Sequence, residues 1–260
     1  MPSVQVGAVE VAYGVEGEGA PLLLVHGTTQ SRAAWLQLAP LLAPTFEVIM
    51  PELPGSGETR DPGGDLEVAD LAHQMVAVAD ALGHERFHLA GYSLGAVVAA
   101  EAAVQVSARV RSLTLLCGWA TTDARMRFTF DLWDRLLKAD PELFARYAFA
   151  DGFTVASFEL FGATIEELLP QMAASFAPGS DRQLELDQRV DIAHRLSAIT
   201  APTLVVGALD DRWVDVRHSR ELAERIPTAR LVELPCGHVG PLSELVAEVS
   251  TMIAAHATGR

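Results

Sequence analysis

Cysteine is scarce in this sequence, which contains only Cys117 and Cys236 among its 260 residues. Two thiols so far apart do not suggest the disulfide framework of a small secreted domain or a cysteine-based zinc site. We therefore expect both to be buried free thiols, which behave as small core residues. A reducing compartment agrees with this cysteine usage, and we expect the protein to be cytoplasmic.

Lysine is rarer still, because Lys138 is the only one and the other basic residues are arginines spread along the chain. The formal net charge is −15 at pH 7. Binding to nucleic-acid phosphates or to anionic lipid requires clustered basic side chains, so we expect neither partner. A small-molecule substrate is the better expectation.

Long apolar runs are also missing. No stretch approaches the roughly 18 residues of a membrane span, and residues 1–20 lack the basic start and apolar centre of a signal peptide. The composition is 50% hydrophobic and 20% charged, which is typical of a folded globular enzyme. The length suits one α/β domain with room for an inserted segment.

Short apolar runs alternate with amphipathic stretches at both ends of the chain. A β-hairpin is predicted over residues 4–15, and strands over 21–25, 46–50, 87–92, 110–117, 202–207 and 230–234. Helical patterns cover residues 31–42, 66–82, 94–106 and 216–225, and a closing helix follows Pro241. Apolar strands that alternate with helices predict an α/β fold with a mainly parallel sheet flanked by helices.

Between residues 121 and 197 this alternation stops and only helical patterns remain. We predict a helical lid, inserted into one core domain that comprises residues 1–120 and 198–260. Eight of the ten phenylalanines fall in this insertion. They either line an apolar pocket or hold the insertion together. For any single phenylalanine we favour packing, because aromatic side chains dominate core burial.

A serine stands where a predicted strand becomes a helix, in the run Gly-Tyr-Ser-Leu-Gly at residues 91–95. A sharp turn at such a junction projects the serine outward, and the two glycines relieve the crowding. The helix that follows directs its free N–H groups toward developing negative charge. Ser93 is therefore our candidate nucleophile, and we expect it in a sparsely populated backbone conformation.

A serine nucleophile needs a general base, and the base needs an orienting group. His238 lies in a glycine-containing loop after the last predicted strand, where it can accept the serine proton and return it to the leaving group. His26 has a similar context, but it precedes the serine and its neighbourhood suits backbone donation. Asp210 and Asp211 both follow the next-to-last predicted strand, and only one of them can orient the imidazole.

Acyl transfer also requires donors for the oxyanion of the tetrahedral intermediate. The backbone N–H of Leu94 is one natural donor. The backbone N–H of Thr28, in the loop after the strand at 21–25, is the second. The alternative for that loop is an ordinary turn.

Taken together, these motifs resemble the α/β-hydrolase superfamily, in particular its serine esterase, lactonase and thioesterase members. The resemblance rests on the His-Gly pair at 26–27, the elbow around Ser93, a strand that ends in Gly-x-x-Asp from Gly207, and the Gly-His pair at 237–238. The order serine, aspartate, histidine also agrees with this superfamily. The match covers the predicted sheet domain and leaves the insertion unassigned.

The resemblance implies a triad of Ser93, Asp210 and His238. Counting forward from Gly207 selects Asp210, whereas counting backward from the helix that contains His218 fits Asp211 equally well. We prefer the forward count, because a strand end fixes geometry more tightly than the loop beyond it.

The implied function is hydrolysis of an ester, lactone or thioester of a small apolar substrate through an acyl-serine intermediate, with no metal or organic cofactor. The alternatives are C–C bond hydrolysis, perhydrolysis, and acyl transfer or cyclisation by the same triad. A ligand-binding protein without turnover is the alternative outside enzymes. Serine at position 93 argues against relatives that use an aspartate nucleophile. Glu52 departs from the Asp-x-Pro-Gly turn of the superfamily, which we expect to change only local hydrogen bonding.

Overall fold

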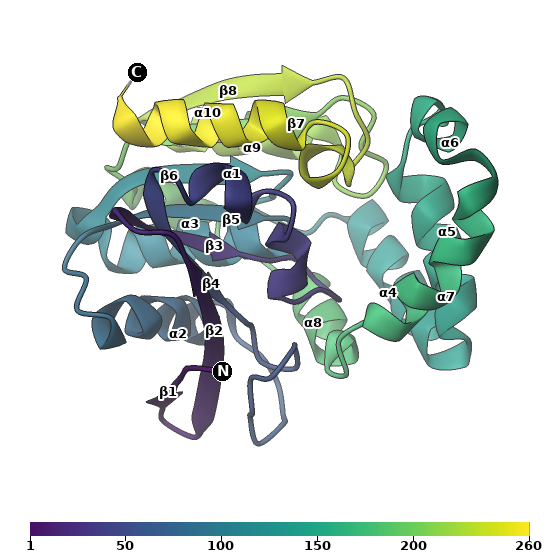
Figure 1. Cartoon of the computed structure of the whole chain (residues 1–260), viewed down its shortest axis with the longest axis horizontal. Helices are drawn as coiled ribbons and strands as arrows, with labels where there is room; N and C mark the ends of the chain where they lie inside the picture. The colour runs from purple at the N-terminus through teal and green to yellow at the C-terminus, as the bar shows by residue number, and fades with distance from the viewer. Residues whose placement is uncertain (260) are drawn as a thin grey trace.

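The structure is a computed structural model that describes residues 1–259. Eight strands form one sheet in the order β1-β2-β4-β3-β5-β6-β7-β8 (Figure 1). They are β1 (Ser3–Val6), β2 (Val9–Glu16), β3 (Ala20–Val25), β4 (Phe46–Pro51), β5 (Phe87–Tyr92), β6 (Val110–Leu116), β7 (Thr203–Ala208) and β8 (Ala229–Leu234). The hairpin strand β2 pairs antiparallel with β1 and β4, and all other pairings are parallel. This confirms the predicted mainly parallel sheet.

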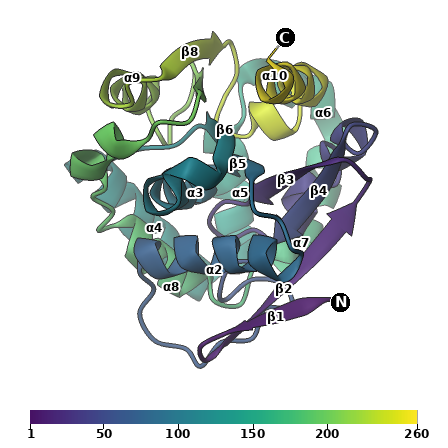
Figure 2. The ribbon, with the colours of Figure 1, turned by 90° about the vertical axis from the view of Figure 1, so that its left-hand side faces the viewer.

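Helices cover both faces of this sheet, and a further group of helices, α4 to α7, lies beyond the ends of its strands (Figure 1). The helices of residues 1–259 are α1 (Ala39–Leu42), α2 (Val68–Ala81), α3 (Leu94–Gln105), α4 (Ala124–Ala139), α5 (Pro141–Gly152), α6 (Val155–Phe161), α7 (Ile165–Ser175), α8 (Ser180–Asp187), α9 (Val216–Arg225) and α10 (Val246–Thr258). Short 3-10 helices are η1 (Arg32–Trp35), η2 (Ser107–Arg109), η3 (Gly162–Thr164), η4 (Ala193–Ala198) and η5 (Gly240–Leu242). Figure 2 shows α2, α3 and α9 on one side of the sheet and α10 on the other.

The side chains of β3 show why its sequence is apolar throughout. Leu23 and Val25 belong to the core under α2 and α3, whereas Leu22 and Leu24 belong to the core under α1 and α10. Successive side chains of a strand point to opposite faces, so a strand covered on both sides needs an apolar residue at every position.

One predicted helix is wrong. Residues 31–42 form two short helices, η1 and α1, separated by a turn. Pro40 lies in the first turn of α1. A proline there lacks the N–H that a continuous helix needs and clashes with the preceding turn, so the helix must restart at this point.

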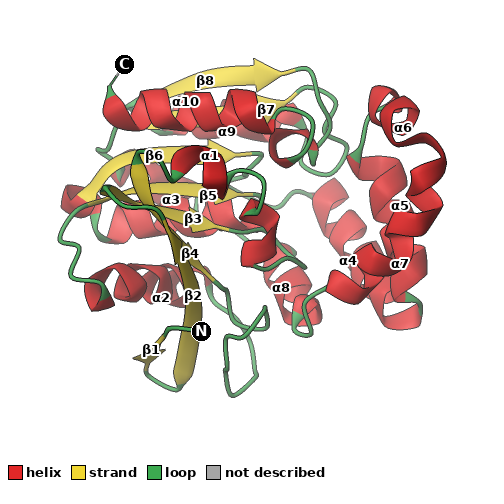
Figure 3. Ribbon diagram, viewed as in Figure 1, coloured by secondary structure: helices red, strands yellow, loops and turns green. Residues whose placement is uncertain are grey.

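The segment between β6 and β7 contains α4 to α8 and no strand within residues 124–198 (Figure 3). Thr121 and Asp191 form an isolated antiparallel bridge, so the two ends of this helical segment lie side by side. Phe149 packs against Phe153, Phe158 and Phe161 at ring-centroid distances of 4.4, 5.3 and 5.5 Å. For these phenylalanines the packing interpretation is confirmed.

Cys117 and Cys236 are both buried free thiols, as expected. Among the helices of residues 1–259, none combines the length and the apolar character that crossing a bilayer demands.

Candidate active site

Ser93 occupies the sharp turn between β5 and α3. Its backbone has φ 55° and ψ −121°, a conformation that few residues other than glycine adopt, at a cost of about 1–3 kcal/mol. The Ser93 N–H donates to Leu116 O at 2.9 Å, which ties the strained turn to the neighbouring strand β6. The strained serine agrees with the sequence-based expectation.

Two glycines make this turn possible. A Cβ atom at Gly91 would lie 2.1 Å from Gly95 O, and one at Gly95 would lie 2.0 Å from Val25 O. Both contacts are to backbone, which cannot move aside as a flexible side chain does. The glycines therefore let α3 start directly against β3 and β5.

We predict that Gly95→Ala lowers the free energy of unfolding by about 3 kcal/mol, because the added methyl group overlaps the β3 backbone. Chemical denaturation measures this change. Gly14→Ala is the matched control, because the nearest atoms to its added Cβ lie 3.5 Å away and the backbone needs no positive φ. Equal stability of the two variants would contradict the steric argument.

Ser93, His238 and Asp211 form a chain of hydrogen bonds. His238 Nε2 lies 3.0 Å from Ser93 Oγ, and His238 Nδ1 lies 2.6 Å from Asp211 Oδ2. The other carboxylate oxygen, Asp211 Oδ1, accepts the N–H groups of Trp213 and Val214, each at 2.8 Å. An acid held in this way fixes the orientation of the imidazole and leaves Nε2 free to accept the serine proton.

The prediction of Asp210 as the partner of His238 is wrong. Asp210 is exposed, and its N–H donates to Cys236 O at 3.0 Å. Leu209 N–H also donates to Leu234 O, at 2.9 Å, so the backbone pairing of β7 continues beyond Ala208. The turn after β7 therefore begins later than we expected from counting forward from Gly207. As a result, Asp211 points inward and Asp210 does not.

The loop after β3 presents the second expected donor. Gly27 passes so close to the elbow that a Cβ atom there would lie 3.0 Å from Ser93 Cβ. Within residues 1–259, neither Thr28 N–H nor Leu94 N–H has a protein acceptor. Both donors expected from the sequence are therefore free to bind an oxygen atom.

His26 holds this loop in place. Its Nδ1 donates to Gly27 O at 2.9 Å, and its Nε2 accepts the N–H of Leu53 at 3.1 Å. Burial lowers the pKa of His26 to about 4, so the ring stays neutral and keeps both bonds. The geometry excludes His26 as the base for Ser93, because both ring nitrogens are occupied.

Glu52 is buried and bonded locally, as expected for this departure from the superfamily pattern. Its Oε2 accepts the N–H of Glu58 at 2.7 Å, and Arg32 Nε lies 3.3 Å from Oε1. The side chain thus closes the turn that follows β4.

Asp187, at the end of α8, was not predicted as a site residue, because no motif in the sequence marks it. Its side chain is fully buried, and Oδ2 accepts the hydroxyl of Thr28 at 2.6 Å. Within residues 1–259, Asp187 Oδ1 has no hydrogen-bond partner. Burial raises the pKa of this carboxyl to about 8, so Asp187 is a neutral acid at pH 7.

This neutral acid predicts a pH-dependent loss of stability. Between about pH 4 and pH 8 the unfolded chain releases the Asp187 proton and the folded chain retains it. The free energy of unfolding of the native protein should therefore fall by roughly 1 kcal/mol per pH unit relative to Asp187→Asn. Urea denaturation of both proteins at several pH values measures the difference. A difference that stays constant with pH would show that Asp187 is ionised in the folded protein.

One group of possible metal ligands shares two residues with the hydrogen-bonded chain of Ser93, His238 and Asp211. Cys117, Asp211 and His238 offer ligand atoms within 4.8 Å of one another. Asp211 and His238 already bond to each other, and burial raises the pKa of the Cys117 thiol well above its ordinary value. Metal ions bind the thiolate, so these residues do not fit a resident metal.

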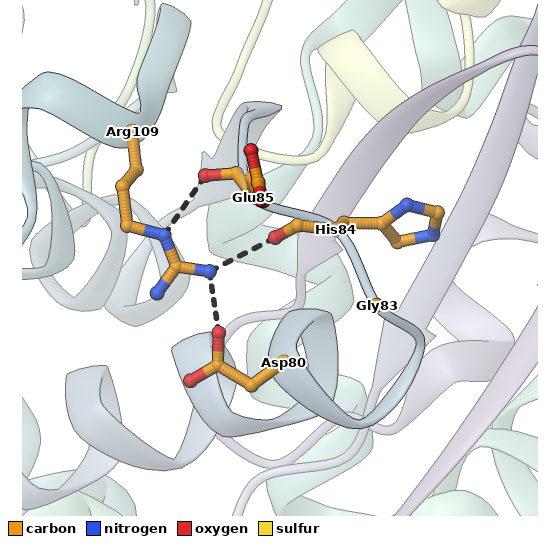
Figure 4. Close-up of a pocket in the computed structure, with 5 residues that line it drawn as sticks. All are labelled: Asp80, Gly83, His84, Glu85 and Arg109. Carbon is orange, nitrogen blue, oxygen red and sulfur yellow. Dashed lines mark hydrogen bonds and ion pairs between the residues drawn. The ribbon is translucent and has the colours of Figure 1, made fainter.

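A surface pocket of about 430 Å³ lies near the amino ends of β5 and β6, opposite the edge that carries Ser93 (Figure 4). Arg109 donates there to Asp80 and to the carbonyl oxygens of His84 and Glu85. These groups are satisfied by one another, so the pocket does not extend the candidate site.

Comparison with known proteins identifies the family. The family model described as alpha/beta hydrolase fold matches residues 20–245. The chain is 33% identical over 243 residues to pyrrolizixenacetamide deacetylase of Xenorhabdus hominickii, covering 92% of this chain and 91% of that protein. It is also 33% identical over 245 residues to the putative carbamate hydrolase RutD of Azorhizobium caulinodans, covering 91% of each.

Solved structures share the fold at low sequence identity. The enol-lactonase of Burkholderia xenovorans LB400 superposes with a TM-score of 0.89 at 20% identity and covers 99% of this chain and 100% of its own. A thermophilic esterase from Thermogutta terrifontis gives a TM-score of 0.86 at 24% identity and covers 100% of this chain and 99% of its own. The chain therefore belongs to the α/β-hydrolase family and is a hydrolase built on that fold.

Proposed function

We propose that this protein is a serine hydrolase that cleaves an acyl bond of a small substrate through an acyl-Ser93 intermediate. The observation that carries the proposal is the hydrogen-bonded chain from Ser93 Oγ through His238 to Asp211. The serine emerges from a strained turn beside two free backbone N–H groups. This combination provides a nucleophile, a base, an orienting acid and oxyanion donors.

In the proposed mechanism, His238 Nε2 accepts the proton of Ser93 as Oγ attacks the substrate carbonyl. Thr28 N–H and Leu94 N–H donate to the oxyanion that forms. His238 then returns the proton to the leaving group, and the acyl-serine remains. Water, deprotonated by His238, attacks the acyl carbonyl, and the imidazolium returns this proton to Ser93 Oγ as the acid product leaves. Asp211 stabilises the imidazolium in both steps.

We propose esters, lactones or thioesters as substrates, with a predominantly apolar acyl or alcohol part. The aromatic ring of Trp213 supports an apolar substrate, because it lies beside the proposed base. Its centroid is 4.8 Å from that of the His238 ring and 4.6 Å from that of the Trp133 ring in α4. Val239 N–H, one residue beyond the base, donates to Gly152 O of α5 at 3.3 Å. These contacts support a role of residues 121–197 as a lid beside the triad.

Amides and carbamates are the second candidate class. The two sequence relatives at 33% identity carry the names deacetylase and carbamate hydrolase. The same triad cleaves a C–N bond when His238 protonates the leaving nitrogen.

Labelling with a fluorophosphonate tests the nucleophile. We expect one label per chain at Ser93, located by peptide mass spectrometry, and none on Ser93→Ala. A panel of esters, lactones, thioesters, amides and carbamates, assayed with the same control, identifies the bond that is cleaved. Absence of labelling, or turnover that Ser93→Ala retains, would refute the proposal.

A further inference from the structure

Helix α8 binds the loop at residues 26–30 through two side chains one helical turn apart. Gln183 Oε1 accepts the N–H of Thr29 at 3.0 Å, and Asp187 Oδ2 accepts the hydroxyl of Thr28 at 2.6 Å. Residues at i and i+4 lie on the same face of a helix, so both point to the loop together. One face of α8 thus bonds to both Thr28 and Thr29.

The loop needs such support because its backbone is strained. Thr29 has φ 66°, in the left-handed region that a β-branched residue rarely adopts. The structure around such a residue must hold it in place. Besides the bond to Gln183, the carbonyl oxygen of Thr29 accepts the N–H of Ala177, at 3.1 Å.

Gln183 connects the loop to a second part of the core. Its side chain is fully buried, and Nε2 donates to Pro54 O at 3.1 Å and to Ser56 Oγ at 2.8 Å. The amide oxygen of Gln183 therefore accepts from Thr29, and the amide nitrogen donates to the segment after β4. A side chain with all these partners in a buried position has one fixed orientation.

The first turn of α8 is itself anchored. Arg182 forms a bidentate ion pair with Asp61, with distances of 2.8 and 3.0 Å. Gly179 N–H donates to Gly55 O at 2.8 Å, and the two glycine backbones are too close for a Cβ at either position. The helix cannot shift without breaking these contacts, so it is a rigid support for the loop.

The protonation state of Asp187 also suits this position. An ionised carboxylate next to Thr28 would repel the negative charge of an oxyanion bound at Thr28 N–H. Burial raises the pKa of Asp187 to about 8, which keeps the group neutral at pH 7. A neutral acid binds the Thr28 hydroxyl without opposing the charge of the intermediate.

We propose that Gln183 and Asp187 are positioning residues that fix Thr28 N–H in the geometry of the oxyanion hole. The inference rests on the proposed function, because it assigns a role to a donor of that mechanism. It makes α8 a part of the catalytic framework, although α8 lies in the segment expected to act as a lid. Neither side chain forms a hydrogen bond with Ser93 or His238.

The test compares four α8 variants with p-nitrophenyl acetate as substrate. Asp187→Ala and Gln183→Ala should each lower kcat by about 10²-fold, because a displaced donor loses much of its stabilisation of the oxyanion. KM should change less than about threefold, since the donor acts mainly in the transition state. Asp187→Asn keeps a neutral acceptor for Thr28 and should restore most of kcat. Glu185→Ala, on the exposed face of α8, is the control and should match the native protein.

A second route keeps the test decisive if Asp187→Ala does not fold. Thr28→Val removes the hydroxyl from the other side of the same hydrogen bond and should lower kcat to the same extent. If both single variants fold, their effects should not add in the double variant, because they break one interaction.

Two results separate failure of this inference from failure of the proposed function. If both alanine variants at 183 and 187 retain the kcat of Glu185→Ala while Ser93→Ala is inactive, the positioning role is wrong and the serine mechanism stands. If Ser93→Ala retains turnover, the proposed function itself fails. A loss of kcat that Asp187→Asn does not restore would also overturn the positioning role.

Discussion

Replacement of His238 by alanine is expected to lower kcat by about 10⁶-fold, as much as replacement of Ser93, because nucleophile and base act as one unit. His238 is the only group within hydrogen-bond distance of Ser93 Oγ among residues 1–259. Without it the serine proton has no acceptor. Steady-state kinetics with the best substrate of the panel measures the loss, and the double variant should be no slower than either single variant.

His73→Ala is the control for this prediction, because His73 is exposed on α2, far from the elbow in the sequence. It should retain native kinetics. If His238→Ala keeps more than about a hundredth of native kcat, another group serves as the base and the proposed mechanism must be revised.

Asp211→Asn is expected to lower kcat by about 10⁴-fold, because an amide at this position favours the wrong imidazole tautomer and cannot stabilise the imidazolium. Asn can still accept the N–H groups of Trp213 and Val214 through its carbonyl oxygen, so the fold should persist. Circular dichroism and thermal unfolding check that it does.

Asp210→Asn provides a matched control with the same chemical change one residue earlier. Asp210 is exposed and its side chain does not reach His238, so kcat should stay within about twofold of native. The reverse outcome, with Asp210→Asn inactive and Asp211→Asn active, would show that the loop adopts a different register in solution.

Local patterns were sufficient to predict the elbow and the sheet. The run at residues 91–95 contains the strained Ser93 and the close contact between Gly91 and Gly95, although the steric limit at Gly95 itself comes from Val25 of β3. The strands are recognisable because burial on both faces makes them apolar throughout. The helix expected at 31–42 failed because a single proline outweighs a helical spacing of apolar residues.

Identification of the aspartate that bonds to His238 required information that the local sequence lacks. Asp210 and Asp211 are equivalent until the pairing of Leu209 with Leu234, and of Asp210 with Cys236, decides which of the two aspartates faces inward. That pairing joins segments about 25 residues apart, and a shift of one residue reverses the direction of the side chain.

Gln183 and Asp187 were missed for a related reason. The contact between Thr28 and Asp187 joins residues 159 positions apart. In the sequence, both side chains resemble the polar positions of an ordinary amphipathic helix. Only the folded chain reveals that they face a buried loop.

The small separate core formed by Ala145, Phe149 and Leu169 has a consequence for how such enzymes diversify. Helices α5 to α7 contact each other through this core, although Phe144 and Ala148 of α5 also belong to the main core. Helix α8 instead bonds to the loop at residues 26–30. Mutations in α6 and α7 can accumulate with less effect on Ser93 and His238 than mutations in α5, because Gly152 of α5 accepts the N–H of Val239 beside His238. New substrate preferences should therefore arise by exchange of residues 155–175, with α8 inherited unchanged.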